Sequence, residues 1–130
     1  MIRLIEFPKV EDPRGNLTFL QSPLVPFTVA RVFWTYDVPG DSIRGGHAYH
    51  NQSEIIISLS GSFDVVVTTP DGLTQRFPLK RSYYGLLIPP LTWRHMENFS
   101  TNAFSLHLSS HNYNGDDYIR DFEKYRELMT

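Results

Sequence analysis

The sequence predicts an all-β sandwich or barrel with one short helix near the C-terminus. Short segments rich in β-branched and aromatic residues recur along the chain, and clusters of proline, glycine and aspartate separate them. Only residues 116–128 have a helical pattern. Many short strands with almost no helix are typical of sandwiches and barrels.

The predicted strands follow one another along most of the chain. A turn at residues 12–16 precedes the first of them, and the Pro70-Asp71-Gly72 sequence is a strong hairpin signal between two others. In the last strand, Phe104, Leu106 and Leu108 share one face. The strands are expected at residues 17–20, 28–35, 54–59, 63–68, 74–79, 85–88 and 103–109.

Length and composition exclude several classes of protein. We expect one domain over residues 1–130, and the absence of cysteine excludes a disulfide scaffold, a thiolate zinc site and a cysteine nucleophile. The net charge of −2 argues against nucleic acid as the main partner. We see no signal peptide and no apolar run long enough to span a membrane, so a cytoplasmic protein is expected.

The basic residues are biased toward arginine, with nine Arg and three Lys. Because the planar guanidinium binds phosphate or carboxylate through two hydrogen bonds, this bias indicates an anionic ligand. Aromatic residues make up 14% of the chain.

Two of the five histidines, His47 and His50, lie close together after a glycine pair. In an extended strand, His47 and Tyr49 project to one face and His50 to the other. A histidine on a strand is often an ordinary satisfied or solvated polar group. The neighbouring Arg44, Tyr49 and Glu54 favour a functional role here.

The chain resembles the cupin superfamily through two motifs. His47, Glu54 and Gly61 reproduce the spacing of the first motif, with Tyr49 in place of its second histidine. This resemblance implies a double-stranded β-helix, or jelly roll, with the short helix appended. The second motif is approximated by Gly85, Pro90, His95 and Asn98.

A closer resemblance is to the nucleotide-sugar 3,4-ketoisomerases of the WxcM-like group, and it covers nearly the whole chain. It implies a metal-free, cofactor-free isomerase that moves a carbonyl from C4 to C3 of dTDP-4-keto-6-deoxyglucose. Such an enzyme serves deoxysugar synthesis for surface polysaccharide such as lipopolysaccharide, and the resemblance also implies a homodimer. The matching segments are residues 12–15, 31–39, 44–48, 60–62, 85–90 with Trp93, and 117–121.

Under this resemblance, His47 is the expected base, Tyr49 the acid or orienting donor, and Arg44 the group that stabilises developing negative charge. Histidine titrates near neutral pH and can transfer protons in either direction. Candidate substrate-binding residues are arginines for the diphosphate, aromatic side chains for the base and the pocket wall, and two further histidines: Arg14, Arg31, Phe33, Trp34, Tyr36, Trp93, His50 and His95.

Two departures from the ketoisomerase pattern leave alternatives open. The pattern normally reads Arg-Gly-x-His-Ala-His-Lys, whereas this chain has Tyr49 and His50 at its last two positions. A related proton transfer or a non-catalytic sugar-nucleotide binding module is therefore an alternative. Glu54 replaces the usual Gln, so a metal-dependent cupin enzyme using His47, Glu54 and His95 is another.

Overall fold

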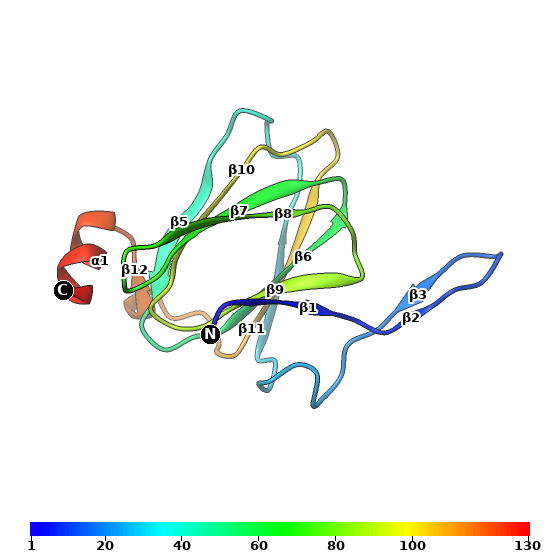
Figure 1. Cartoon of the computed structure of the whole chain (residues 1–130), viewed down its shortest axis with the longest axis horizontal. Coiled ribbons are helices and arrows are strands. Elements are labelled where there is room, and N and C mark those ends of the chain that lie inside the picture. The colour runs from blue at the N-terminus through cyan, green and yellow to red at the C-terminus, as the bar shows by residue number, and fades with distance from the viewer.

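The computed structural model describes residues 1–130 and consists mainly of two five-stranded antiparallel sheets (Figure 1). In the first sheet the strand order is β1 (Arg3–Glu6), β9 (Tyr84–Ile88), β6 (Glu54–Ser60), β11 (Phe104–Ser109) and β4 (Arg31–Thr35). In the second it is β12 (Tyr118–Ile119), β5 (Arg44–Tyr49), β10 (Trp93–Glu97), β7 (Phe63–Thr68) and β8 (Thr74–Leu79). The predicted all-β jelly roll is confirmed.

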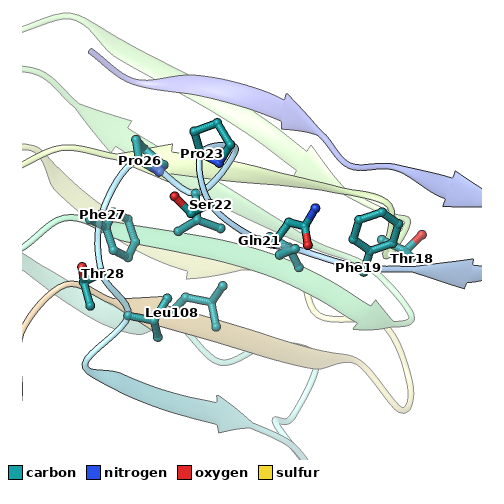
Figure 2. A pocket seen from close by; sticks show the side chains of 12 residues that line it. Thr18, Phe19, Gln21, Ser22, Pro23, Pro26, Phe27, Thr28 and Leu108 are labelled. Carbon is teal, nitrogen blue, oxygen red and sulfur yellow. The ribbon is translucent and has the colours of Figure 1, made fainter.

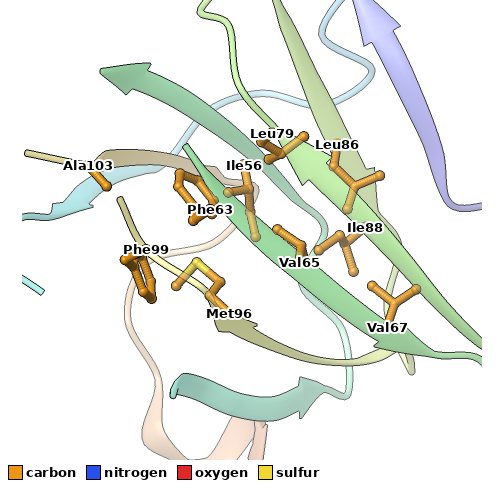
Figure 3. Close-up of a cluster of buried hydrophobic side chains, with 10 residues drawn as sticks. All are labelled: Ile56, Phe63, Val65, Val67, Leu79, Leu86, Ile88, Met96, Phe99 and Ala103. Atoms are coloured by element: carbon orange, nitrogen blue, oxygen red, sulfur yellow. The ribbon is translucent and has the colours of Figure 1, made fainter. Parts of the chain in front are cut away.

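Apolar side chains from both sheets form the main core between them. Figure 3 shows Ile56 and Leu86 of the first sheet with Val65, Val67 and Met96 of the second. Along β7, buried residues alternate with partly exposed ones, as expected for a strand with one face in the core.

The interior is polar at its other end. Three buried polar side chains lie there: Glu54 of β6, Arg94 of β10 and His107 of β11. The same strands also supply or flank the apolar core. Buried charges are costly unless they are paired, so this region requires a specific hydrogen-bonding arrangement.

A two-stranded hairpin, β2 (Lys9–Val10) and β3 (Leu17–Thr18), projects away from both sheets (Figure 1). Its tip contains the turn predicted at residues 12–16, where Gly15 has φ +128°. The outer face of the first sheet is covered in part by the segment that follows the hairpin, which includes Val25.

The C-terminal region differs from the prediction. A helix was expected from residue 116, but residues Gly115–Asp117 form a 3₁₀ turn and β12 then pairs with β5. Helix α1 spans Phe122–Met129, because the Asp121 side chain accepts hydrogen bonds from the first-turn amides and caps the helix there. Strands β1, β2, β10 and β12 were not predicted. No helix in the structure has the length and apolar character needed to cross a membrane.

The turn between β6 and β7 depends on glycine. Gly61 has φ +66°, and a Cβ atom at this position would lie 2.9 Å from Cα of Ala103. Gly72, in the hairpin between β7 and β8, has φ +86° and open space around it. The two positions share backbone strain but differ in crowding.

We therefore predict that Gly61→Ala is more destabilising than Gly72→Ala. The positive φ costs about 1–3 kcal/mol at either site. Overpacking against Ala103 adds about 1–3 kcal/mol at Gly61 only. Urea unfolding of the two variants measures the difference in the free energy of unfolding, and equal losses would contradict this account.

Candidate active site

The largest hollow in the structure lacks the groups needed for acid–base chemistry. It is a groove of about 820 Å³ formed by the segment between β3 and β4 and by Leu108 (Figure 2). Its lining contains no histidine, tyrosine, arginine, lysine or carboxylate. This groove therefore provides no side chain suited to general acid–base catalysis.

A smaller cavity of about 270 Å³ between the two sheets contains the chemistry-bearing residues. Strand β5 supplies His47 and Tyr49, while Glu54, Arg94 and His107 come from the buried polar end of the interior. The cavity also includes residues nearer its mouth and along its walls, among them Phe33, Arg44, Tyr118 and Arg120.

His47 lies beside Tyr49, as strand alternation predicts, and their ring centroids are 4.7 Å apart. Its Nε2 atom is 3.3 Å from Nη1 of Arg94. Because guanidinium only donates, Nε2 accepts and the neutral ring carries its proton on Nδ1. Burial, followed by the charge of Arg94, lowers the pKa of His47 to about 3, so the ring is neutral at pH 7.

Two tyrosines and an arginine meet beside His47. The Tyr49 hydroxyl donates to that of Tyr118 over 3.2 Å, and Nη2 of Arg31 donates to both oxygens over 3.4 and 3.3 Å. Burial and the carboxylate of Glu54 raise the pKa of Tyr49 well above its ordinary value. Tyr49 is therefore a protonated donor at neutral pH.

A buried ion pair joins the two sheets behind these rings. Nη1 of Arg94 donates to Oε1 of Glu54 over 2.7 Å, and Nδ1 of His107 donates to Oε2 over 3.0 Å. Burial alone would raise the pKa of Glu54, but Arg94 and His107 outweigh it and lower that pKa to about 2. Glu54 is an ionised carboxylate with both oxygens occupied.

Five of the predicted site residues gather at this cavity. Arg44 is exposed at its edge, next to His47 and Tyr49. Phe33 forms part of the wall and stacks on His107, with 4.4 Å between ring centroids. The Arg31 guanidinium lies over the Phe33 ring at 4.7 Å and reaches the tyrosine hydroxyls.

Three predicted aromatic residues lie elsewhere, because alternation along β10 and along and just beyond β4 directs them away from the cavity. Trp34 and Tyr36 are 52% and 61% exposed and stack on Phe104. Trp93 is buried on the opposite side of β10 from Arg94, where it packs against Tyr125 of α1.

Three predicted polar residues also lie outside the cavity. His50 is exposed just after β5 ends. His95 alternates with Arg94 on β10, so its Nε2 contacts Glu97 at 2.7 Å on the outer face. Arg14 is at the hairpin tip, paired with Asp12 at 2.8 Å.

The alternative metal-ligand set is not assembled in this structure. His47 and Glu54 line the cavity, whereas His95 faces away from it. Both carboxylate oxygens of Glu54 are already bonded, to Arg94 and to His107. No group of three histidine or carboxylate side chains is placed to hold a metal ion, so the residues present do not fit a cupin metal centre.

Sequence reasoning missed four cavity residues. His107 alternates out of phase with Leu106 and Leu108, a pattern that indicates either solvent or the interior and does not decide between them. Arg94 required the strand β10 to be recognised. Tyr118 and Arg120 enter only because β12 pairs with β5, which no local signal predicts.

The family model described as WxcM-like, C-terminal (FdtA) matches residues 1–130. A curated relative from Aneurinibacillus thermoaerophilus, a TDP-4-oxo-6-deoxy-alpha-D-glucose-3,4-oxoisomerase, is 31% identical over 130 residues, which cover 98% of this chain and 92% of the relative.

Two solved structures are similar to nearly the whole chain. A 3,4-ketoisomerase from Helicobacter canadensis shares 32% identity with a TM-score of 0.94, over 98% of this chain and 96% of the other. A sugar 3,4-ketoisomerase from Thermoanaerobacterium thermosaccharolyticum, in complex with TDP, also shares 32% identity with a TM-score of 0.94, over 98% and 93%.

These relatives confirm the isomerase class predicted from the motifs around His47 and Gly85. The match extends over both sheets and the C-terminal helix, not over the motifs alone. The chain belongs to the WxcM-like, C-terminal (FdtA) family of sugar 3,4-ketoisomerases.

Proposed function

We propose that the chain converts TDP-4-keto-6-deoxyglucose to its 3-keto isomer, with His47 as the base that removes the C3 proton. The observation that carries this proposal is the contact between a neutral histidine and a protonated tyrosine, His47 and Tyr49, inside one cavity. The named activity of the relatives supplies the substrate class.

The chemistry proceeds through an enediol. His47 takes the proton from C3, the electron pair shifts into the C3–C4 bond, and protonated His47 gives the C4 oxygen a proton. Tyr49 then delivers a proton to C4 and regains one from the C3 hydroxyl, which leaves the carbonyl at C3. Tyr49 serves as the donor, held in place by Tyr118 and Arg31.

Arg44 and Arg120 provide positive charge at the cavity, where negative charge develops on the substrate oxygens. The cavity volume of about 270 Å³ is below the usual range of about 300–1,000 Å³ for drug-sized ligands. We place the deoxyhexose ring inside it and the nucleoside diphosphate outside, toward these arginines.

The functional form is proposed to be a homodimer. The edge strand β4 leaves Val32 and Trp34 half exposed, and the projecting hairpin exposes Val10 and Leu17. An unpaired edge strand with exposed apolar side chains favours association with a second chain. Because the hairpin projects away from both sheets (Figure 1) and none of its residues lines the cavity, a role for Arg14 in substrate binding requires a second copy of the chain.

A cytoplasmic location is proposed from the substrate. A nucleotide-linked sugar carries a diphosphate charge that prevents it from crossing a bilayer unaided. The enzyme must therefore act in the compartment where its substrate is made.

The role of His47 as base is tested by replacing its side chain. His47→Asn is expected to lower kcat by roughly 10²–10⁴-fold, because the side chain no longer accepts the C3 proton. Thermal unfolding and binding of TDP should remain close to those of the unchanged protein.

His111→Asn is the matched control, since His111 lies in an exposed loop away from the cavity. An His47→Asn protein with the turnover of the unchanged enzyme would contradict the assignment of the base.

The pH dependence of turnover follows from the lowered pKa of His47. The base must be neutral, and the pKa of His47 is lowered to about 3, so the neutral form persists as pH falls. We expect that kcat/KM shows no loss from protonation of His47 between pH 7 and pH 5. A histidine with an ordinary pKa near 6.5 would instead cause a loss of roughly 30-fold at pH 5. An acid limb near pH 6.5 that is absent in His47→Asn would contradict this.

A further inference from the structure

We propose that Glu54 and Arg94 are positioning residues for His47: their buried ion pair selects the ring nitrogen that carries the proton and keeps the other, Nε2, unprotonated. This inference rests on the proposed function, in which His47 is the base. Neither residue was a candidate for this role from the sequence.

The hydrogen atoms on Nη1 of Arg94 are fully accounted for. One is donated to Oε1 of Glu54 over 2.7 Å, and the other points to Nε2 of His47 at 3.3 Å. Nε2 can satisfy this donor only with a lone pair. The geometry therefore specifies the tautomer protonated at Nδ1, and Nε2 keeps a lone pair that can take a proton once its hydrogen bond from Arg94 opens.

Glu54 is itself held from a second direction, so the direction of Arg94 is fixed. Nδ1 of His107 donates to Oε2 of Glu54, and Nε2 of His107 contacts Oγ of Ser105 at 2.8 Å. Ser105 in turn contacts the hydroxyl of Thr35. These contacts form a connected chain that ends at the Glu54 carboxylate. The Glu54, Arg94 and His107 side chains are only 2–3% exposed.

Arg94 also contacts the proposed proton donor. Its guanidinium carbon lies 4.9 Å from the centre of the Tyr49 ring, a cation–π contact. A single side chain therefore touches both the histidine and the tyrosine. Nε and Nη2 of Arg94 are buried without a hydrogen-bond partner, an arrangement that is unfavourable for stability alone.

Glu54 balances the charge that Arg94 brings into the interior. The charged and titratable groups that act on His47 are Arg94, Arg120 and His107, which oppose a proton on the ring, and Glu54, which favours it. When His47 takes the C3 proton, its positive charge develops beside Arg94, and Glu54 is the group that offsets it.

The test compares the unchanged protein with the double variant Glu54→Gln/Arg94→Met, which removes both buried charges and leaves none unpaired. The ¹⁵N chemical shifts of His47 report which ring nitrogen carries the proton. We expect Nδ1–H in the unchanged protein and a shift toward Nε2–H in the double variant. We expect kcat to fall roughly 10²-fold, as for a misoriented catalytic group, with little change in KM.

Arg76→Met is the matched control. Arg76 pairs with Asp64 at 2.7 Å and Glu97 at 2.8 Å, but on the exposed face of the second sheet. This substitution should leave both the tautomer of His47 and kcat unchanged.

Several results would overturn the inference. One is an Nε2–H tautomer in the unchanged protein, a measurement that does not depend on any variant folding. The others are a double variant that keeps the Nδ1–H tautomer and a double variant that keeps the original kcat. The tautomer is measured without turnover, whereas the role of His47 as base is tested by His47→Asn. Failure of the positioning role and failure of the proposed function are therefore distinguishable.

Discussion

The ion pair between Arg94 and Glu54 is the interaction on which the site depends. It joins the second sheet to the first across the interior, and both side chains are withdrawn from water. Removing one partner of such a pair typically costs about 3–5 kcal/mol, because the other charge is left buried and uncompensated. His47, Tyr49 and His107 each contact one member of this pair, so their orientations follow from it.

The polar site and the apolar core arise from the same strands. Two residues after Glu54, Ile56 enters the core, and two residues after Arg94, Met96 does the same. Residues two apart on a strand lie on the same face, so the strand face that lines the cavity continues directly into the apolar core. The apolar end supplies burial and holds the sheets together, which keeps the two charged groups at hydrogen-bonding distance.

The sequence was sufficient for the fold class and for the face shared by His47 and Tyr49, because both follow from alternation and turn signals. It failed where a decision needed the pairing of distant strands. Trp93 was assigned to the pocket by residue type, although its neighbour Arg94 occupies the inner face of β10. The start of the C-terminal helix was also wrong, since pairing of Tyr118 with Tyr49 overrides local helical preference.

Deuterium exchange tests the central claim, proton transfer at the cavity, most directly. The protein is incubated with TDP-4-keto-6-deoxyglucose in deuterated water, and the sugar ring is followed by NMR. The account predicts deuterium at C3 of recovered substrate and at C4 of product, because protons that pass through His47 and Tyr49 exchange with solvent. Binding without exchange at any ring carbon would contradict it and would indicate a sugar-nucleotide binding module.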